Sequence, residues 1–214
     1  MEHHIHTTYD KGFEDALTDQ ALHEKIMASP SIKNKCDEIH AILRSCRIKK
    51  SVQSKILQKM IPYIIPQGTK GNIRGNMLND MVKQRVTAIT RNKKKLTAFF
   101  EYIPKKLHGI IHERPDWVIE HTDGHMVVGY TQIDLWGGGQ QINRAAKYIL
   151  NDALHKRLQK MNIKLICLVT KKPTLSRKKC KTQTVIRKGF KTGRIILPKS
   201  LPSVVKDLCM HLTG

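Results

Sequence analysis

Residues 115–141 read PDWVIEHTDGHMVVGYTQIDLWGGGQQ, and this stretch decides the fold. Apolar and polar residues alternate in 117–122 and again in 126–135, the pattern of strands that have one buried face. Asp123-Gly124 between the two segments is a typical hairpin turn pair. We therefore expect an antiparallel hairpin at this point of the chain.

The residues that follow the hairpin predict an α/β arrangement. Residues 140–160 carry an apolar stripe at helical spacing, and 164–170 (KLICLVT) form a continuous apolar run that is typical of a central strand. A helix between two strands predicts a crossover connection. Beyond it we expect edge strands at 182–187 and 194–197, and a closing helix from Pro202 to about Leu212.

The residues that precede the hairpin predict mainly helices. Apolar residues recur at helical spacing in 11–27, 32–47 and 51–61, and Pro62 and Pro66 are expected to end the third helix. A Gly-rich basic loop at 67–76 and a fourth helix at 76–89 follow; residues 96–103 fit a helix or a strand. We expect a helical N-terminal region at 1–66 and an α/β core with a basic C-terminal segment at 67–214.

Net charge is the strongest indication of a partner. The 214 residues include 39 Lys and Arg but only 17 Asp and Glu, which gives a net charge of +22. So basic a domain indicates binding to a polyanion, above all nucleic acid, whose phosphates attract Lys and Arg. Aromatic residues make up only 5%, which argues against a single-strand stacking platform and favours duplex DNA.

Cysteine usage and hydropathy indicate an intracellular protein. The five cysteines are scattered without a CxxC pair, which argues against a structural zinc site and fits a reducing compartment. No apolar run is long enough to span a membrane, and no signal pattern is present. We expect a protein of the cytoplasm, or of the host cell interior if viral, with no membrane partner.

Three segments carry candidate DNA contacts. Glycines allow a backbone to approach phosphates closely, and Gln, Asn and Arg can hydrogen-bond base edges. Each segment also has a plainer interpretation: a turn between helices, a tight turn into a helix, and a solvated basic loop. The GGG run lacks the spacing of a nucleotide-binding P-loop. The candidates are Lys70 and Arg74; Gln140, Gln141, Asn143 and Arg144; and Arg177, Lys178, Lys179 and Lys181.

The hairpin resembles a known family. Pro115-Asp116 at the head of one strand, and a Q-x-D-L-W-x-G-G-x-Q type segment from Gln132 on the next, resemble the PD-(D/E)XK nucleases, of which type II restriction endonucleases are the largest group. The resemblance covers about 68–170. It implies a restriction-endonuclease-like fold: an α/β protein with a mixed β-sheet core flanked by helices, here with a helical N-terminal part.

The resemblance also implies a catalytic site. Asp116 is the expected principal ligand of Mg²⁺, which would activate a water molecule for phosphodiester hydrolysis. The family's acid-x-Lys should fall on 130–132, where Tyr130 replaces the acid and Gln132 replaces the lysine. Gln132 is expected to orient the attacking water. The candidates for the second carboxylate are Asp134, also a metal ligand, then Glu120, then Glu101 or Glu113; Lys147 is a candidate for the electrostatic role of the lysine.

Hairpin register decides whether this site forms. If Asp123, Gly124 and His125 form the loop, Asp116 lies opposite Gln132 and Glu120 opposite Val128, on one face of the sheet. A two-residue loop would instead place Thr131 opposite Asp116. Without a site, Asp116 would be a turn residue after Pro115, Asp134 would cap the Gly-rich turn and Gln132 would be a buried amide that bonds to the backbone.

Two functions follow as expectations. The first is a Mg²⁺-dependent, sequence-specific endonuclease of the restriction type that cleaves double-stranded DNA. It would act as a homodimer, because symmetric duplex sites match two-fold symmetric proteins, and a cognate methyltransferase is a possible functional partner. The second is a non-catalytic basic DNA-binding protein on a nuclease-like scaffold, which the loss of the acid at Tyr130 favours.

Overall fold

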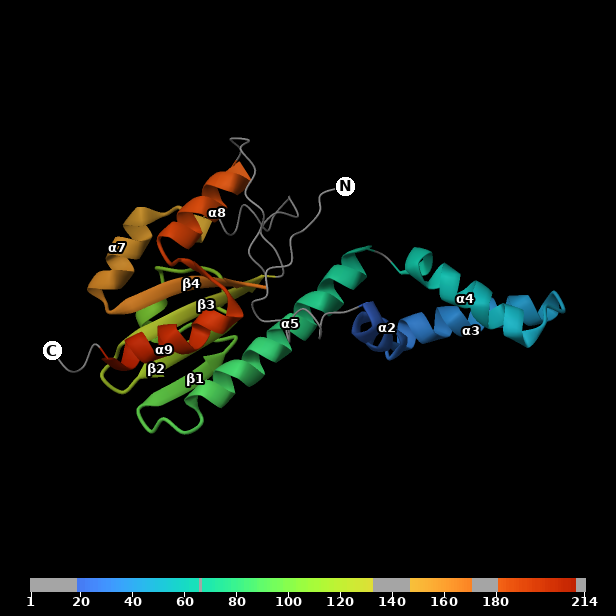
Figure 1. Ribbon diagram of the computed structural model, residues 1–214, viewed down its shortest axis with the longest axis horizontal. Coiled ribbons are helices and arrows are strands. Elements are labelled where there is room, and N and C mark those ends of the chain that lie inside the picture. Colours follow the sequence, from blue (N-terminus) through green and yellow to red (C-terminus); the bar gives the residue numbers. More distant parts are fainter. Residues whose placement is uncertain (1–18, 66, 133–146, 171–180, 211–214) are drawn as a thin grey trace. The chain divides into compact units, whose positions relative to one another are not determined.

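A five-stranded mixed sheet forms the centre of the α/β part of the molecule (Figure 1). The structure, a computed structural model, describes residues 19–65, 67–132, 147–170 and 181–210. The strand order is β1-β2-β3-β4-β5, with the first two pairings antiparallel and the last two parallel. The strands are β1 (Leu96–Phe100), β2 (Trp117–His121), β3 (Met126–Gln132), β4 (Ile163–Val169) and β5 (Ile195–Ile196).

Helices precede the sheet and flank it. The first four are α2 (Asp19–Met27), α3 (Pro30–Ser45), α4 (Lys50–Ile64) and α5 (Gln67–Thr90). Those that follow are α7 (Asp152–Lys160), α8 (Lys181–Lys191) and α9 (Leu201–Met210), with short 3₁₀ turns at Lys105–Leu107 and Pro198–Ser200. Residues 19–77 form one compact helical unit, and the described residues from Leu78 onward form another around the sheet. None of the helices in the described ranges has the length and apolarity needed to cross a lipid bilayer.

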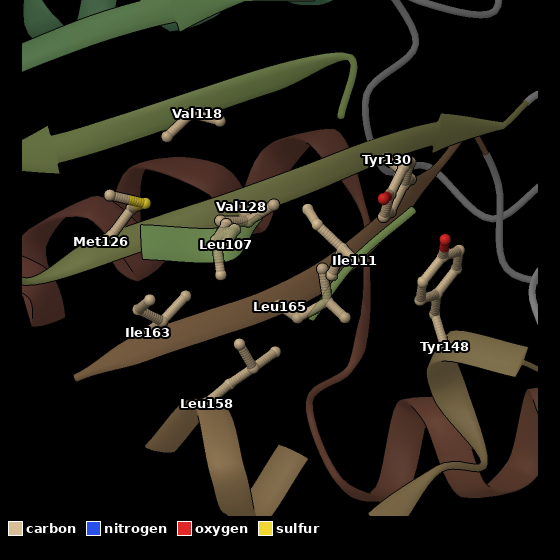
Figure 2. Close-up of a cluster of buried hydrophobic side chains, with 10 residues drawn as sticks. All are labelled: Leu107, Ile111, Val118, Met126, Val128, Tyr130, Tyr148, Leu158, Ile163 and Leu165. Carbon is tan, nitrogen blue, oxygen red and sulfur yellow. The ribbon is translucent and has the colours of Figure 1, made fainter. Parts of the chain in front are cut away.

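Both faces of the sheet are buried. On one face, Val118, Val128 and Leu165 pack against Leu158 of α7 (Figure 2), and the neighbouring cluster joins Val169 to Val185 of α8. The residues that alternate with these along the strands are buried too, and α9, which contacts β2 and β3, covers this second face. The helical unit has its own core, formed by Ile26, Ile32, Cys36, Leu57 and Ile65.

Several expected elements are confirmed. The two hairpin strands, the central strand β4 and the final helix are present, and the ambiguous segment 96–103 contains strand β1. The edge strand expected at 194–197 is present as the two-residue β5. The mixed sheet with flanking helices and a helical N-terminal part follows from these elements.

Four predictions about helices were wrong. Residues 67–76 are not a loop: they are the first turns of α5, where Ile73 packs against the core of the helical unit. Residues 182–187 are not a strand: they lie in α8, because Val185 and Ile186 reach the core together with Phe190 only at helical spacing. In both segments, burial outweighs weak local propensity.

The other two wrong predictions concern helix ends. Pro62 does not end α4 but lies in its last turn, where a missing N–H costs a single hydrogen bond. The helix expected across 140–160 is interrupted: a helical turn at 147–149 ends, and α7 begins at Asp152. Asn151 caps this new start, because its side chain accepts a hydrogen bond from the N–H of Leu154 at 3.0 Å.

Candidate functional site

The predicted catalytic residues Asp116 and Gln132 both lie at one end of the sheet. Here β1 ends, β2 begins and β3 ends, because both pairings are antiparallel. The N–H of Glu101 donates to the carbonyl of Asp116 at 3.2 Å, and the N–H of Asp116 donates to the carbonyl of Gly129 at 3.1 Å. Residues that lie far apart in sequence thus converge on Asp116.

The carboxylate of Asp116 is held by the backbone of β3. Its Oδ2 accepts a hydrogen bond from the N–H of Thr131 at 2.6 Å. The next residue, Gln132, ends β3 and is only 8% exposed. Among the described residues, no donor reaches Oε1 of Gln132. A buried amide oxygen without a donor is costly, typically by ~1–3 kcal/mol, and is therefore a candidate ligand or proton acceptor.

The hairpin register differs from the predicted one. The loop consists of Thr122, Asp123 and Gly124, closed by a hydrogen bond from the N–H of His121 to the carbonyl of His125 at 2.8 Å. Consequently Val118 pairs with Val128. The continuation of this register places Asp116 opposite Tyr130, rather than opposite Gln132 as predicted. Because 130 and 132 lie on the same face of a strand, the change shifts Gln132 along the sheet without turning it to the other face.

The side chain of Asp123 explains this loop. Its Oδ1 accepts a hydrogen bond from the N–H of His125 at 2.9 Å, and its two oxygens lie 2.8 and 2.9 Å from the Nδ1 atoms of His121 and His125. Burial opposes ionisation of Asp123, but these hydrogen bonds outweigh it and lower the pKa of the carboxyl to about 2. Gly124 then closes the turn with a φ of 91°.

The structure does not bring Glu120 into this site. Glu120 pairs with Met126 at the opposite end of the hairpin. Six residues separate Met126 from Gln132, which is roughly 20 Å along a strand. The prediction that Glu120 supplies a carboxylate beside Asp116 is therefore corrected.

Tyr130, where the resemblance to nucleases would place an acid, packs in the core and anchors a neighbouring segment. Its hydroxyl donates to the carbonyl of Glu113 at 2.7 Å, and its ring stacks on Tyr148 with the centroids 4.7 Å apart (Figure 2). Only 3% of Tyr130 is exposed. The ammonium of Lys147 lies 3.9 Å from a carboxylate oxygen of Glu113. Tyr130 thus places Glu113 and Lys147 close to the end of β3.

Glu101 is an acid whose backbone bonds to that of Asp116, and it ranks behind Asp134 and Glu120 among the candidates for the second carboxylate. It follows β1 directly, with a φ of 51°, and its Oε1 accepts a hydrogen bond from Lys83 of α5 at 2.8 Å. This bond, with a further contribution from Arg114, lowers the pKa of the Glu101 carboxyl. The signal in the sequence is an acid immediately after a strand, which is a common place for site residues at a sheet end.

The other candidates divide into two groups. Lys70 and Lys181 lie on α5 and α8, with side chains outside the described set, and Arg74 is half-buried on α5. The remaining candidates lie wholly outside the described residues: Asp134, Gln140, Gln141, Asn143, Arg144, Arg177, Lys178 and Lys179.

Oxygen donors at this end of the sheet suit a hard cation. Mg²⁺ is commonly held by one or two carboxylates and keeps several waters. The carboxylate of Asp116 and the amide oxygen of Gln132, which accepts no hydrogen bond from a described residue, are the kinds of ligand that such a partial set would need. Glu101 or Glu113 is a candidate for a further carboxylate. Within the described ranges, no three Asp, Glu, His or Cys side chains gather as a ready metal site.

No protein-family model matches this chain, and none of the curated proteins matches it.

Proposed function

We propose that this protein is a Mg²⁺-dependent endonuclease of the type II restriction kind, which hydrolyses phosphodiester bonds of double-stranded DNA at a specific sequence. One observation carries the proposal: the carboxylate of Asp116 accepts a hydrogen bond from the N–H of Thr131, and the next residue, Gln132, has a buried amide oxygen without a donor among the described residues. In this proposal the mixed sheet is a restriction-endonuclease-like core, and the protein acts inside the cell.

Each residue has a distinct role in this proposal. Mg²⁺, when bound, would supply positive charge and lower the pKa of a bound water. Asp116 would hold the ion, and the N–H of Thr131 keeps the carboxylate in one orientation. Oε1 of Gln132 accepts a hydrogen bond from the attacking water and so orients it. Asp134, Glu101 or Glu113 would provide the second carboxylate.

Basic side chains around this end would neutralise the phosphate. Lys83 is paired with Glu101, and Lys147 lies near Glu113. Each ammonium group could therefore donate a hydrogen bond to a scissile phosphate bound at this end of the sheet. The net charge of +22 supplies long-range attraction for the duplex. A homodimer would match a symmetric recognition site, and a methyltransferase would protect that site in the organism's own DNA.

A non-catalytic DNA-binding protein on the same scaffold is the second candidate. Two observations favour it: Tyr130 replaces the acid and is committed to packing, and no three-ligand metal group occurs among the described residues. Basic charge and duplex binding are common to both candidates, so only catalysis separates them.

Digestion of plasmid and viral DNA tests the proposal. Wild type is compared with Asp116→Ala, each with Mg²⁺, with Mn²⁺ and with EDTA. Discrete bands that need the metal and disappear in the variant are expected. Absence of cleavage by wild type under every condition, with intact salt-sensitive binding of duplex DNA, would replace the endonuclease by the non-catalytic binding protein.

A further inference from the structure

The solvent face of α4 carries an unusual combination of side chains. Val52, Lys55, Lys59 and Tyr63 are spaced by three, four and four residues, so they form one stripe along the helix. All four are exposed, Val52 by 43% and Tyr63 by 90%. The opposite side of α4 supplies Leu57 to the core of the helical unit. The stripe is therefore not needed to fold this helix.

The stripe lies in a segment without negative charge. Residues 39–79 contain eight Lys or Arg and no Asp or Glu. None of the ion pairs between described residues involves Lys55 or Lys59. Arg44, Arg47, Lys49 and Lys50, at the turn between α3 and α4, are exposed as well. Exposed cations at this density attract a polyanion.

We infer that this α4 stripe, which shares no residue with the candidate catalytic end of the sheet, is a contact surface for duplex DNA. Lysine ammonium and tyrosine hydroxyl groups donate to phosphate oxygens, whereas Val52 and the Tyr63 ring suit sugar and thymine methyl surfaces. The major groove is wide enough for an α-helix. The inference rests on the DNA binding of the proposed function, and it assigns part of that binding to the helical unit.

Charge argues against a second copy of the chain as the occupant. A two-fold interface presses the same patch against itself. Lys55 and Lys59 of one copy would then face the same lysines of the other, and like charges brought together without counter-charges are unfavourable. Exposed Val52 and Tyr63 are apolar enough to raise this alternative, and the experiment below includes it as an outcome.

The test measures duplex binding by the full chain without divalent ions. A fluorescein-labelled 30-base-pair duplex is titrated in EDTA at several KCl concentrations, and fluorescence anisotropy gives Kd. In Lys55→Gln/Lys59→Gln, the slope of log affinity against log salt should become shallower by about 1.8, since each lost phosphate contact removes about 0.9. Affinity at the lowest salt should fall roughly tenfold or more.

Lys33→Gln/Lys35→Gln is the matched control. It removes the same charge from the same helical unit, but these exposed lysines lie on α3 close to Asp37 and Glu38. Its salt slope should stay near that of wild type. Circular dichroism checks that each variant is folded. If the α4 variant keeps the wild-type slope, or if both variants lose slope equally, the inference is overturned.

Val52→Ser/Tyr63→Ser separates DNA from self-association. This variant should weaken duplex binding with little change in salt slope, and sedimentation velocity should give the same mass as wild type. A fall in mass with unchanged DNA binding would make the stripe an interface between copies. If wild type binds duplex DNA but never cleaves it, only the endonuclease proposal is refuted. If wild type cleaves DNA and the Lys55→Gln/Lys59→Gln variant binds with the wild-type salt slope, only this inference is refuted.

Discussion

The indole of Trp117 lies over Gly129, its partner across the hairpin, and occupies the space that a Cβ at 129 would need. The same indole donates from Nε1 to Oγ1 of Thr131 at 3.2 Å. Gly129 and Thr131 are therefore both tied to Trp117, the residue that follows Asp116. This arrangement holds the register in which the N–H of Thr131 reaches the Asp116 carboxylate.

Gly129→Ala should destabilise the sheet. The added methyl group would overlap the Trp117 ring, which is 1% exposed and has no room to move. We expect a loss of about 3 kcal/mol in the free energy of unfolding, measured in urea. Gly75→Ala is the control, because nothing lies within 4 Å of a Cβ there and Ala is favoured in a helix by about 0.5–1 kcal/mol. Equal effects of the two substitutions would contradict this account.

Gln132→Leu should separate stability from activity. Removing a buried oxygen without a donor removes its desolvation cost, so the melting temperature should stay the same or rise. Cleavage should fall about 100-fold or more, because the water loses its orienting group. Gln132→Lys, which restores the lysine of the resembled family, should retain cleavage. A strong loss of stability in Gln132→Leu would show that the amide serves the fold.

Tyr130→Phe should cost about 1 kcal/mol of unfolding free energy, the usual net value of one hydrogen bond. The substitution removes the bond to the carbonyl of Glu113 and keeps the ring that stacks on Tyr148. Urea unfolding provides the measurement. Tyr148→Phe is the matched comparison, because the Tyr148 hydroxyl is buried without a partner among the described residues and its loss should cost less.

Asp152→Asn should lower the melting temperature at neutral pH and have little effect near pH 2. Lys188 and Arg194 each donate to Asp152 at 2.6 Å, and these hydrogen bonds lower the pKa of its carboxyl from 3.8 to about 2. A depressed folded-state pKa stabilises the fold above the unfolded value, and this stability is lost as pH falls through the folded value. The difference between wild type and variant should therefore shrink between about pH 4 and pH 2.

Asp37→Asn is the control for this pH series. Asp37 is an exposed acid on α3 and takes part in none of the ion pairs between described residues. Its substitution should leave the melting temperature almost unchanged at every pH. A difference at Asp152 that stays constant from pH 7 to pH 2 would contradict the ion-pair explanation.

Local sequence was sufficient for some elements and insufficient for others. The hairpin and β4 were predictable because strand alternation and turn residues act between near neighbours. The helices at 67–76 and 182–187 were missed because glycines and β-branched residues locally disfavour them. Their formation depends on burying Ile73, Val185 and Ile186 against residues far away in the chain.

The sequence by itself determined the basic charge, the hairpin, and the placement of Asp116 before its first strand and of Gln132 near the end of its second, since these depend on composition and local pattern. Only the tertiary structure decided the register, through Asp123 in the loop and Trp117 over Gly129. It also placed Glu120 at the end of the hairpin away from Asp116, and it joined the backbone of Glu101 to that of Asp116. Tyr130 packs in the core and bonds to the carbonyl of Glu113. Such relations depend on contacts between distant segments, and no local pattern encodes the distance between two strands' ends.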